Sequence, residues 1–332
     1  MRRLDVHFHF VPPVYREAVS AASLRIAVRV PEWSPEPALA LMDRQGIDAA
    51  ILSISVPGTH FGDDKKARAL SRACNEYAAD LIARKPDRFG AFAALPLPDV
   101  DGAVDEIGHA LDVLKLDGVA LITSYGQDHL GHPRFDPVLA ALDERDAAVF
   151  IHPTAHPACG QLTMNIPAFL VEYPFDTTRA AVNLVLSGAM DRYPRIRFIL
   201  PHAGGTLPFL SWRIAEVTAT LLAEPALMSR YPLPFVTDHR AELTPEFIAS
   251  YLRRFWLDTA SAAGPQVLAC LKHFADPEHV LLGTDWPYIT ETQVANTVRE
   301  LDESCGEESL RQAINHRNAI RLFPRFDRSR QN

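Results

Sequence analysis

The chain has 332 residues, of which 48% are hydrophobic and 22% are charged, a composition typical of a globular protein with a large core. Its formal net charge of -8 argues against nucleic acid or an anionic membrane as a partner, because both bind basic surfaces. The four cysteines form no CxxC pair, no stretch approaches the length of a membrane span, and the N-terminus lacks the apolar core of a signal peptide. We therefore expect a cytoplasmic protein with reduced thiols.

Short apolar runs alternate with longer helical segments along the whole chain, as in a buried parallel sheet. The predicted strands are Leu4–Phe10, Ala49–Ile54, Phe89–Leu95, Gly118–Ile122, Ala148–His152, Ile196–Leu200, Phe255–Asp258 and Val280–Gly283. The predicted helices are Pro35–Gln45, Asp64–Lys85, Val100–Lys115, Asp136–Arg145, Thr177–Arg192, Leu207–Leu222, Gly264–Phe274 and Thr292–Cys305. Eight such units predict a closed (β/α)8 barrel, the TIM-barrel fold.

A doubly wound open sheet is the alternative fold. It would normally carry a glycine-rich phosphate loop after its first strand, whereas Val-Pro-Pro follows Phe10. We find no internal repeat, low-complexity tract or interdomain linker, so a single domain over residues 1–332 is expected. Two irregular segments, Val56–Asp63 and Leu222–Glu246, are predicted to be insertions in the loops after strands, where barrel enzymes bind substrate.

The first predicted strand carries two histidines at positions that share one face. Residues two apart in a strand point the same way, so His7 and His9 project together. At the C-terminal end of a barrel strand both imidazoles face the mouth, where they could chelate one divalent ion. The spacing alone leaves open two unrelated histidines on a strand.

Three later strands also end in a polar side chain that can bind a metal or transfer a proton. These residues are His152, His202 and Asp285. A buried imidazole or carboxylate is costly unless it is paired or coordinated. One such residue alone would more often be a capping group, but the same pattern on four strands predicts a shared site at the barrel mouth.

With these residues in place, the chain resembles the amidohydrolase superfamily. The phrases FDTTRAAVNLVLSG, LPHAGGTLPFLSWR, GTDWPY and NHRNAIRLF resemble its amidohydrolase-related decarboxylases, which act on aminocarboxymuconate semialdehyde, γ-resorcylate or 6-methylsalicylate. The phrases DVHFHFVPPVYREA and PEWSPEPALALMDRQGIDAAILSIS are most similar to the 6-methylsalicylate type. The resemblance extends from about residue 4 to residue 323.

The resemblance implies a set of metal ligands, namely His7, His9, His152 and Asp285. Members with two metals use a carboxylated lysine on the fourth strand, but Gly118–Ile122 contains no lysine, so one ion per chain is expected. A nitrogen-rich set with one carboxylate suits Zn²⁺, with Mn²⁺ as the alternative. His202 is implied to be an acid–base residue that is not a ligand, and its alternative role is to orient Asp285.

The resemblance and the aromatic residues near the predicted loops also suggest substrate contacts. A flat ring would suit aromatic side chains, although each of these is more often a core residue when taken alone: Phe10, Trp33, Phe175, Trp286 and Tyr288. Arg213 matches an arginine that reaches the neighbouring subunit's site in the semialdehyde decarboxylase, which implies a homodimer. Asp176 is predicted to be a helix N-cap, and Asp5 to be structural.

These features predict a metal-dependent carboxy-lyase that releases CO₂ from a small aromatic carboxylic acid of the salicylate type. Asp285 or His202 would protonate the ring carbon, and no organic cofactor would be needed. The first alternative is a metal-dependent hydrolase of the same superfamily, such as a lactonase, which would use the same ligands. The second is a noncatalytic metal-binding scaffold. Product analysis separates the first alternative, because hydrolysis releases no CO₂.

Overall fold

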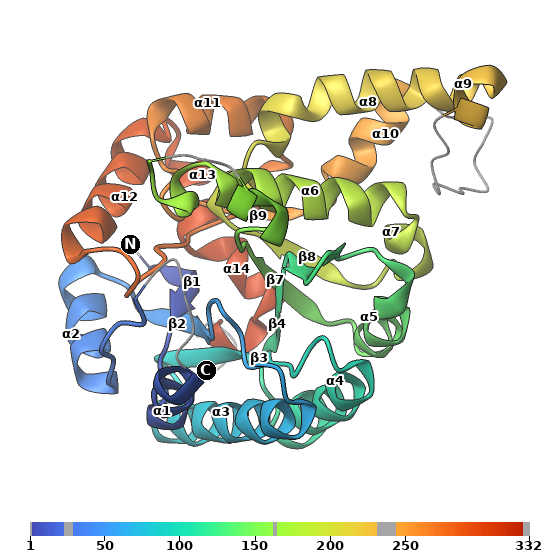
Figure 1. Ribbon diagram of the computed structural model, residues 1–332. Helices are drawn as coiled ribbons and strands as arrows, with labels where there is room; N and C mark the ends of the chain where they lie inside the picture. Colours follow the sequence, from blue (N-terminus) through green and yellow to red (C-terminus); the bar gives the residue numbers. More distant parts are fainter. Residues whose placement is uncertain (1, 23–28, 162–164, 231–243, 328–332) are drawn as a thin grey trace.

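A computed structural model describes residues 2–22, 29–161, 165–230 and 244–327 (Figure 1). Most of the second predicted insertion, residues 231–243, lies outside the described residues. Eight parallel strands form one sheet in the order β1-β2-β3-β4-β7-β8-β9-β10. Their bounds are β1 Leu4–His9, β2 Ala49–Ser53, β3 Phe89–Ala94, β4 Gly118–Ile122, β7 Ala148–His152, β8 Arg197–Leu200, β9 Trp256–Asp258 and β10 Val280–Leu281.

Backbone hydrogen bonds between β1 and the segment after β10 close the sheet into a barrel. Val6 N donates to Leu282 O at 2.9 Å, and His9 N donates to Trp286 O at 2.7 Å. Asp285 N donates in turn to His7 O at 2.7 Å. The predicted (β/α)8 barrel is therefore confirmed, and the closure holds Asp285 beside the histidines of β1.

Helices surround the barrel (Figure 1), as expected for strands buried on both faces. Among the described residues no helix is long and apolar enough to cross a membrane. The hairpin β5 Ser124–Tyr125 and β6 Asp128–His129 follows β4. The helices are α1 Pro13–Ala22, α2 Pro35–Gln45, α3 Asp64–Arg84, α4 Val100–Ile107, α5 Asp136–Asp143, α6 Glu172–Leu186, α7 Ala189–Arg192, α8 Leu207–Ala223, α9 Pro225–Arg230, α10 Pro245–Leu252, α11 Pro265–Phe274, α12 Glu291–Ser304, α13 Glu308–Gln312 and α14 Ala319–Leu322.

The interior of the barrel is filled with apolar side chains. The rings of Phe92 and Phe150 stack with centroids 5.5 Å apart, and Phe323, just after α14, packs edge-on against Phe92 at 5.8 Å. All three side chains are buried. His7 lies next to this cluster, with its ring centroid 4.8 Å from that of Phe150. The site at the mouth therefore lies directly above a layer of buried aromatic side chains.

The prediction that Asp176 caps a helix is wrong. Helix α6 begins at Glu172, so Asp176 lies within the helix. Pro174 falls in the first turn, where a proline is tolerated because the first amides of a helix have no partner within it. The Asp176 carboxylate is fully buried, accepts a hydrogen bond from Thr123 Oγ1 and lies 2.9 Å from His129 Nε2. Through these two contacts Asp176 connects α6 to the segment that follows β4.

Candidate metal centre and active site

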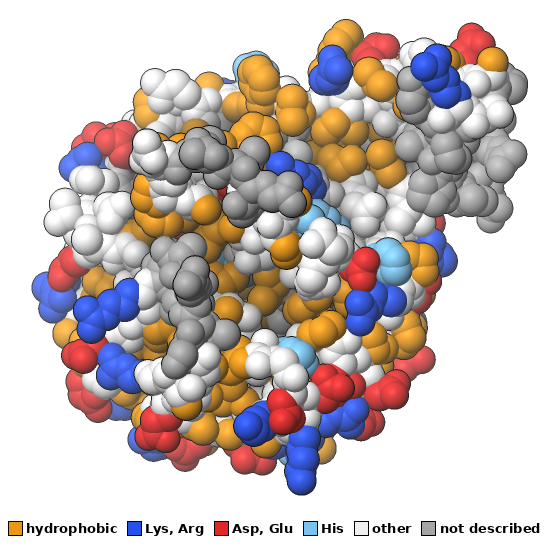
Figure 2. Space-filling view, in the orientation of Figure 1, with side chains coloured by type: hydrophobic (Ala, Val, Ile, Leu, Met, Phe, Trp, Pro, Cys, Tyr) orange, Lys and Arg blue, Asp and Glu red, His pale blue; other side chains and the backbone are white. Residues whose placement is uncertain are grey.

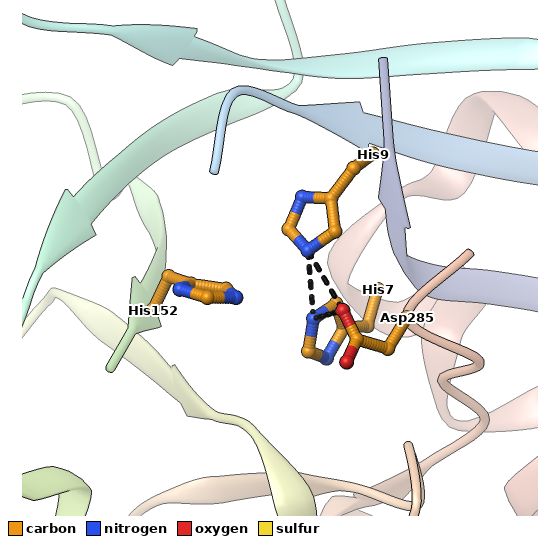
Figure 3. A group of neighbouring side chains, drawn as sticks. All are labelled: His7, His9, His152 and Asp285. Atoms are coloured by element: carbon orange, nitrogen blue, oxygen red, sulfur yellow. Dashed lines mark hydrogen bonds and ion pairs between the residues drawn. The ribbon is translucent and has the colours of Figure 1, made fainter. Parts of the chain in front are cut away.

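Four side chains from three parts of the sheet converge at the C-terminal ends of the strands (Figure 3). They are His7 and His9 of β1, His152 at the end of β7, and Asp285 after β10. One nitrogen or oxygen atom from each lies within 4.8 Å of the others. His7 Nε2 is 3.1 Å from His9 Nε2, and Asp285 Oδ1 is 3.2 Å from His7 Nε2 and 3.1 Å from His9 Nε2.

These separations fit the donor set of a divalent ion. Tetrahedral nitrogen and oxygen ligands about 2.0–2.1 Å from Zn²⁺ lie about 3.3 Å from one another. All three histidines are buried, whereas the side chain of Asp285 is 15% exposed. The group therefore resembles a buried cation site that is open on the side of Asp285, as a catalytic metal site requires.

Backbone and hydroxyl groups orient two of the imidazoles. His152 Nδ1 donates to the carbonyl oxygen of Pro153 at 2.8 Å. His9 Nδ1 lies 3.2 Å from the carbonyl oxygen of Ser53 and 2.9 Å from its Oγ. A carbonyl oxygen only accepts, so both rings carry their hydrogen on Nδ1 and direct the lone pair of Nε2 into the group. Metal-binding histidines commonly engage their second nitrogen in this way.

Asp258, at the end of β9, orients the third imidazole and was not identified from the sequence. Its Oδ2 accepts from His7 Nδ1 at 2.8 Å, and its Oδ1 accepts from the backbone amides of His202 and Ala260, each at 2.9 Å. The carboxylate is fully buried. The signal was present in the sequence, because Asp258 ends the seventh apolar run as His152 ends the fifth.

The electrostatics of the group favour a cation. Burial, aided by the neighbouring His9 and His7, holds the pKa of His152 well below its usual value, and burial also lowers the pKa of His9. Burial acts to raise the pKa of Asp285, but the charge of His7 and hydrogen bonds from neighbouring histidines hold it well below its usual range. Neutral imidazoles and an ionised carboxylate are the forms that bind metals.

His7 differs from the other two histidines because it lies between two carboxylates. Burial acts to lower its pKa, but the charges of Asp258 and Asp285 outweigh burial and raise the pKa to about 10. A proton on His7 balances these carboxylates in the absence of a metal. A divalent cation beside His7 Nε2 would supply the same balance.

His202 lies beside the group without being one of its four members. Its Nε2 is 3.5 Å from Asp285 Oδ2, on the side away from the oxygen that faces His7 and His9. Its Nδ1 is buried and has no hydrogen-bond partner among the described residues. His202 and Asp285 both have positive φ angles, 54° and 69°, a conformation that costs on the order of 1–3 kcal/mol and clusters at functional sites.

Three of the predicted aromatic contacts pack into the core outside the barrel. Phe10 is 2% exposed, and its ring lies 6.0 Å from that of Trp33. Trp286 packs on the buried ring of Phe8 at 5.0 Å. Trp33 and Trp286 are partly buried against the hydrophobic core that contains Phe8 and Phe10.

The remaining predicted contacts lie in different places. The ring of Tyr288 is 5.2 Å from that of His9, so it forms one wall of the group. Phe175, in the first turns of α6, is 41% exposed. Arg213 is exposed on α8. The structure therefore brings Tyr288 to the four-residue group, and Phe175 and Arg213 to the protein surface. Asp5 is fully buried and accepts from the backbone and hydroxyl of Thr284, which agrees with a structural role.

A cavity of about 300 Å³ lies at the same end of the barrel, and none of the four residues is among those that line it. Its walls come from the ends of β2, β3 and β4, the loops that follow them, and Thr154. Ile122, in its wall, pairs with His152 in the register of β4 and β7. Ser55, adjacent to the lining residue Ile54, places its Oγ 3.3 Å from His152 Nε2. Figure 2 shows hydrophobic side chains around the hollow on this face.

Comparison with known proteins agrees with this fold. The amidohydrolase family model matches residues 4–325. A 6-methylsalicylic acid decarboxylase from Penicillium expansum is 37% identical, with 98% of this chain and 97% of that protein covered. The crystal structure of a 2,6-dihydroxybenzoate decarboxylase in complex with 2,6-dihydroxybenzoate aligns with a TM-score of 0.77 and 25% identity, covering 97% of this chain and 98% of that one.

A third protein shares the fold at lower identity. The dihydroxybenzoic acid decarboxylase from Polaromonas sp. JS666, crystallised with manganese and 2-nitroresorcinol, has a TM-score of 0.80 and 23% identity, covering 97% of this chain and 96% of that one. The barrel and the cluster of three histidines and one aspartate at its mouth, which could hold a metal ion, are those of an amidohydrolase-like protein. Since the family model spans nearly the whole chain, the protein belongs to the amidohydrolase family, and its relatives include decarboxylases of aromatic acids.

Proposed function

We propose that this protein is a metal-dependent, nonoxidative decarboxylase of a hydroxybenzoate of the salicylate type, with 6-methylsalicylate among its candidate substrates. The observation that carries the proposal is the group of His7, His9, His152 and Asp285 with His202 beside it, in a chain 37% identical to a 6-methylsalicylic acid decarboxylase. Fold alone would not support a reaction, because related barrels host many chemistries.

The four-residue group would hold one divalent cation per chain. A site of three imidazoles and one carboxylate suits Zn²⁺, and Mn²⁺ is the alternative because relative affinity does not decide which metal a protein carries. When bound, the ion would supply a Lewis acid for the substrate's carboxylate and its neighbouring hydroxyl. A single ion is proposed because Gly118–Ile122, the fourth barrel strand, contains no lysine.

His202 is proposed to supply the proton. Asp285 is the other candidate, but it is engaged as a ligand and could donate only after release from the ion. Transfer of a proton from His202 to the ring carbon that bears the carboxylate interrupts the aromatic system. The bond from this carbon to the carboxylate then breaks, its electron pair returns to the ring, and CO₂ leaves. His202 takes up a proton from water before the next turnover.

A homodimer is proposed from the exposed apolar surface of α8. Phe209 is 83% exposed, Trp212 is 72% exposed and Val217 is 45% exposed, and Arg213 lies among them. Figure 2 shows hydrophobic side chains along this helix in the upper part of the view. Exposed apolar patches of this kind mark interaction sites, and a second copy would bury them and bring Arg213 to the partner. Light scattering should give twice the chain mass, and Trp212→Glu should give a monomer.

Metal content and products are measured together to test the reaction. Elemental analysis should find about one Zn or Mn per chain, and a panel of hydroxybenzoates should release CO₂ with formation of the matching phenol. His7→Ala should lose metal and activity together, whereas His273→Ala, an exposed histidine on α11, should keep both. Opening of a lactone without CO₂ release would favour the hydrolase. A protein that cannot be loaded with metal would refute the proposed centre.

A further inference from the structure

The cavity of about 300 Å³ differs chemically from the four-residue group. Among the described residues, its lining includes no lysine, arginine, aspartate or glutamate. The walls combine apolar side chains with uncharged polar ones such as Thr154, and His60, the lining histidine, pairs with Asp64 at 2.8 Å. The cavity therefore offers no charge to hold a carboxylate. A substrate that binds the metal through its carboxylate would present an uncharged part to this space.

Small side chains on two barrel strands create the space. Ala94 of β3 and Ala120 of β4 both line the cavity. Ala120 is partly exposed, although its neighbours Val119 and Leu121 are buried. A water molecule in the liquid takes up roughly 30 Å³, so a cavity of about 300 Å³ holds far more than the methyl group of a ring.

One buried hydroxyl in the lining has no partner. Ser124 is 5% exposed, and its Oγ has no hydrogen-bond partner among the described residues. A buried polar group without a partner costs about 1–3 kcal/mol in proteins, so such groups are usually satisfied by a ligand or a water. The Oγ of Ser124 is itself covered by its neighbours, so rotation of this side chain would be needed to turn the hydroxyl into the cavity.

We propose that this cavity determines which ring substituent the enzyme accepts, and that it takes an uncharged alkyl or alkoxyalkyl group larger than methyl. The inference rests on the proposed decarboxylase function, which places the carboxylate at the metal. The small side chain of Ala120 leaves room in the cavity, and this room determines how long the ring substituent can be. Ser124, after rotation of its side chain into the cavity, donates a hydrogen bond to an ether or hydroxyl oxygen in the group. A charged substituent is excluded because the cavity would leave it unpaired.

The test compares 2-hydroxybenzoates that carry hydrogen, methyl, propyl, methoxymethyl or carboxymethyl at each open ring position. For the wild-type enzyme, kcat/KM should rise about fourfold per buried methylene at one ring position, and carboxymethyl should be rejected there. Ala120→Leu should lower the preference for propyl over hydrogen at least tenfold. The matched control is Ala83→Leu, at an exposed position on α3, which should leave the preference unchanged.

Ser124→Ala tests the hydroxyl separately. It should lower kcat/KM for the methoxymethyl acid, relative to kcat/KM for the propyl acid, by about fivefold, since a neutral hydrogen bond contributes about 1 kcal/mol. Metal content and thermal unfolding are measured for each variant. If Ala120→Leu fails to fold, Ala94→Val and Ser124→Ala carry the test. Unchanged preference in folded, metal-loaded variants would overturn the proposal, as would rejection of propyl at every position.

Failure of the cavity and failure of the reaction can be told apart. If no acid releases CO₂, dissociation constants for the same panel are measured by calorimetry on the metal-loaded protein. Tighter binding of propyl than hydrogen, abolished by Ala120→Leu, would support the cavity and reject the reaction. CO₂ release from the unsubstituted acid without any chain-length preference would support the reaction and reject the cavity.

Discussion

Asp258→Asn provides a sharp test of how the four-residue group is held. Asparagine has the shape of aspartate, and its carbonyl oxygen can still accept from the amides of His202 and Ala260. Its amide nitrogen then faces His7 Nδ1, which lies 2.8 Å from the carboxylate in the structure. Two donors cannot share this contact. His7 must therefore move its hydrogen from Nδ1 to Nε2, the atom that would bind the metal.

The expected cost follows from this change of tautomer. Loss of a group that orients a metal-binding histidine typically lowers metal affinity about 10- to 100-fold, or about 1.4–2.7 kcal/mol. Asp258 is fully buried, so water does not replace the lost contact, and the upper end of the range is expected. Metal affinity is measured by competition with a chelator of known affinity, and folding by thermal unfolding of the metal-free protein.

Asp176→Asn is the matched control. Asp176 is also fully buried and also contacts a histidine, His129, but neither residue belongs to the four-residue group. This variant should lose stability while binding metal as the wild type does. If Asp258→Asn binds metal within a factor of about two of the wild type, or if both variants lose metal equally, the tautomer argument is refuted.

Three further changes test other parts of the structure. His202→Asn should keep the metal and lower kcat by about 10²-fold or more, since a general acid contributes on that scale; loss of metal would contradict its assignment as a residue outside the ligand set. Phe92→Ala should lower the free energy of unfolding by about 3–5 kcal/mol in denaturant titration, because it leaves a cavity beside Phe150 and Phe323, and Phe92→Leu should cost less. Burial raises the pKa of Cys74 to about 12, so iodoacetamide at pH 8 should modify Cys74 only after unfolding, and modification of the folded protein would contradict its burial.

The barrel can be predicted from the sequence because each strand is a short apolar run between helical segments. The structure confirms all eight runs, two of them with the predicted bounds and six with one end shifted by one or two residues. The convergence of His7, His9, His152 and Asp285 is predictable for a related reason. All four lie near or just after the C-terminal ends of strands, and the ends of parallel strands meet at one rim of a barrel.

Other features depend on contacts between distant segments and are not readable from local sequence. Asp176 resembles an N-cap, but Pro174 fits inside the first turn of α6 and the helix begins earlier. Phe10 precedes a loop, yet its ring is buried and packs near that of Trp33. The cavity arises where Ala94 and Ala120 meet across two strands, so it has no signature in either strand alone.

The two parts of the site come from different strands. The four candidate ligands, together with His202 and Asp258, lie on or after β1, β7, β8, β9 and β10. The cavity is built mainly by β2, β3 and β4. Ser53 and Ser55 provide contacts between the halves. Mutations at the C-terminal ends of β3 and β4 are therefore expected to change which substituted acids bind, while the candidate ligands and His202 stay unchanged. Such a division would let one barrel acquire new substrates in single steps, and it marks the region where a mutant library should be directed.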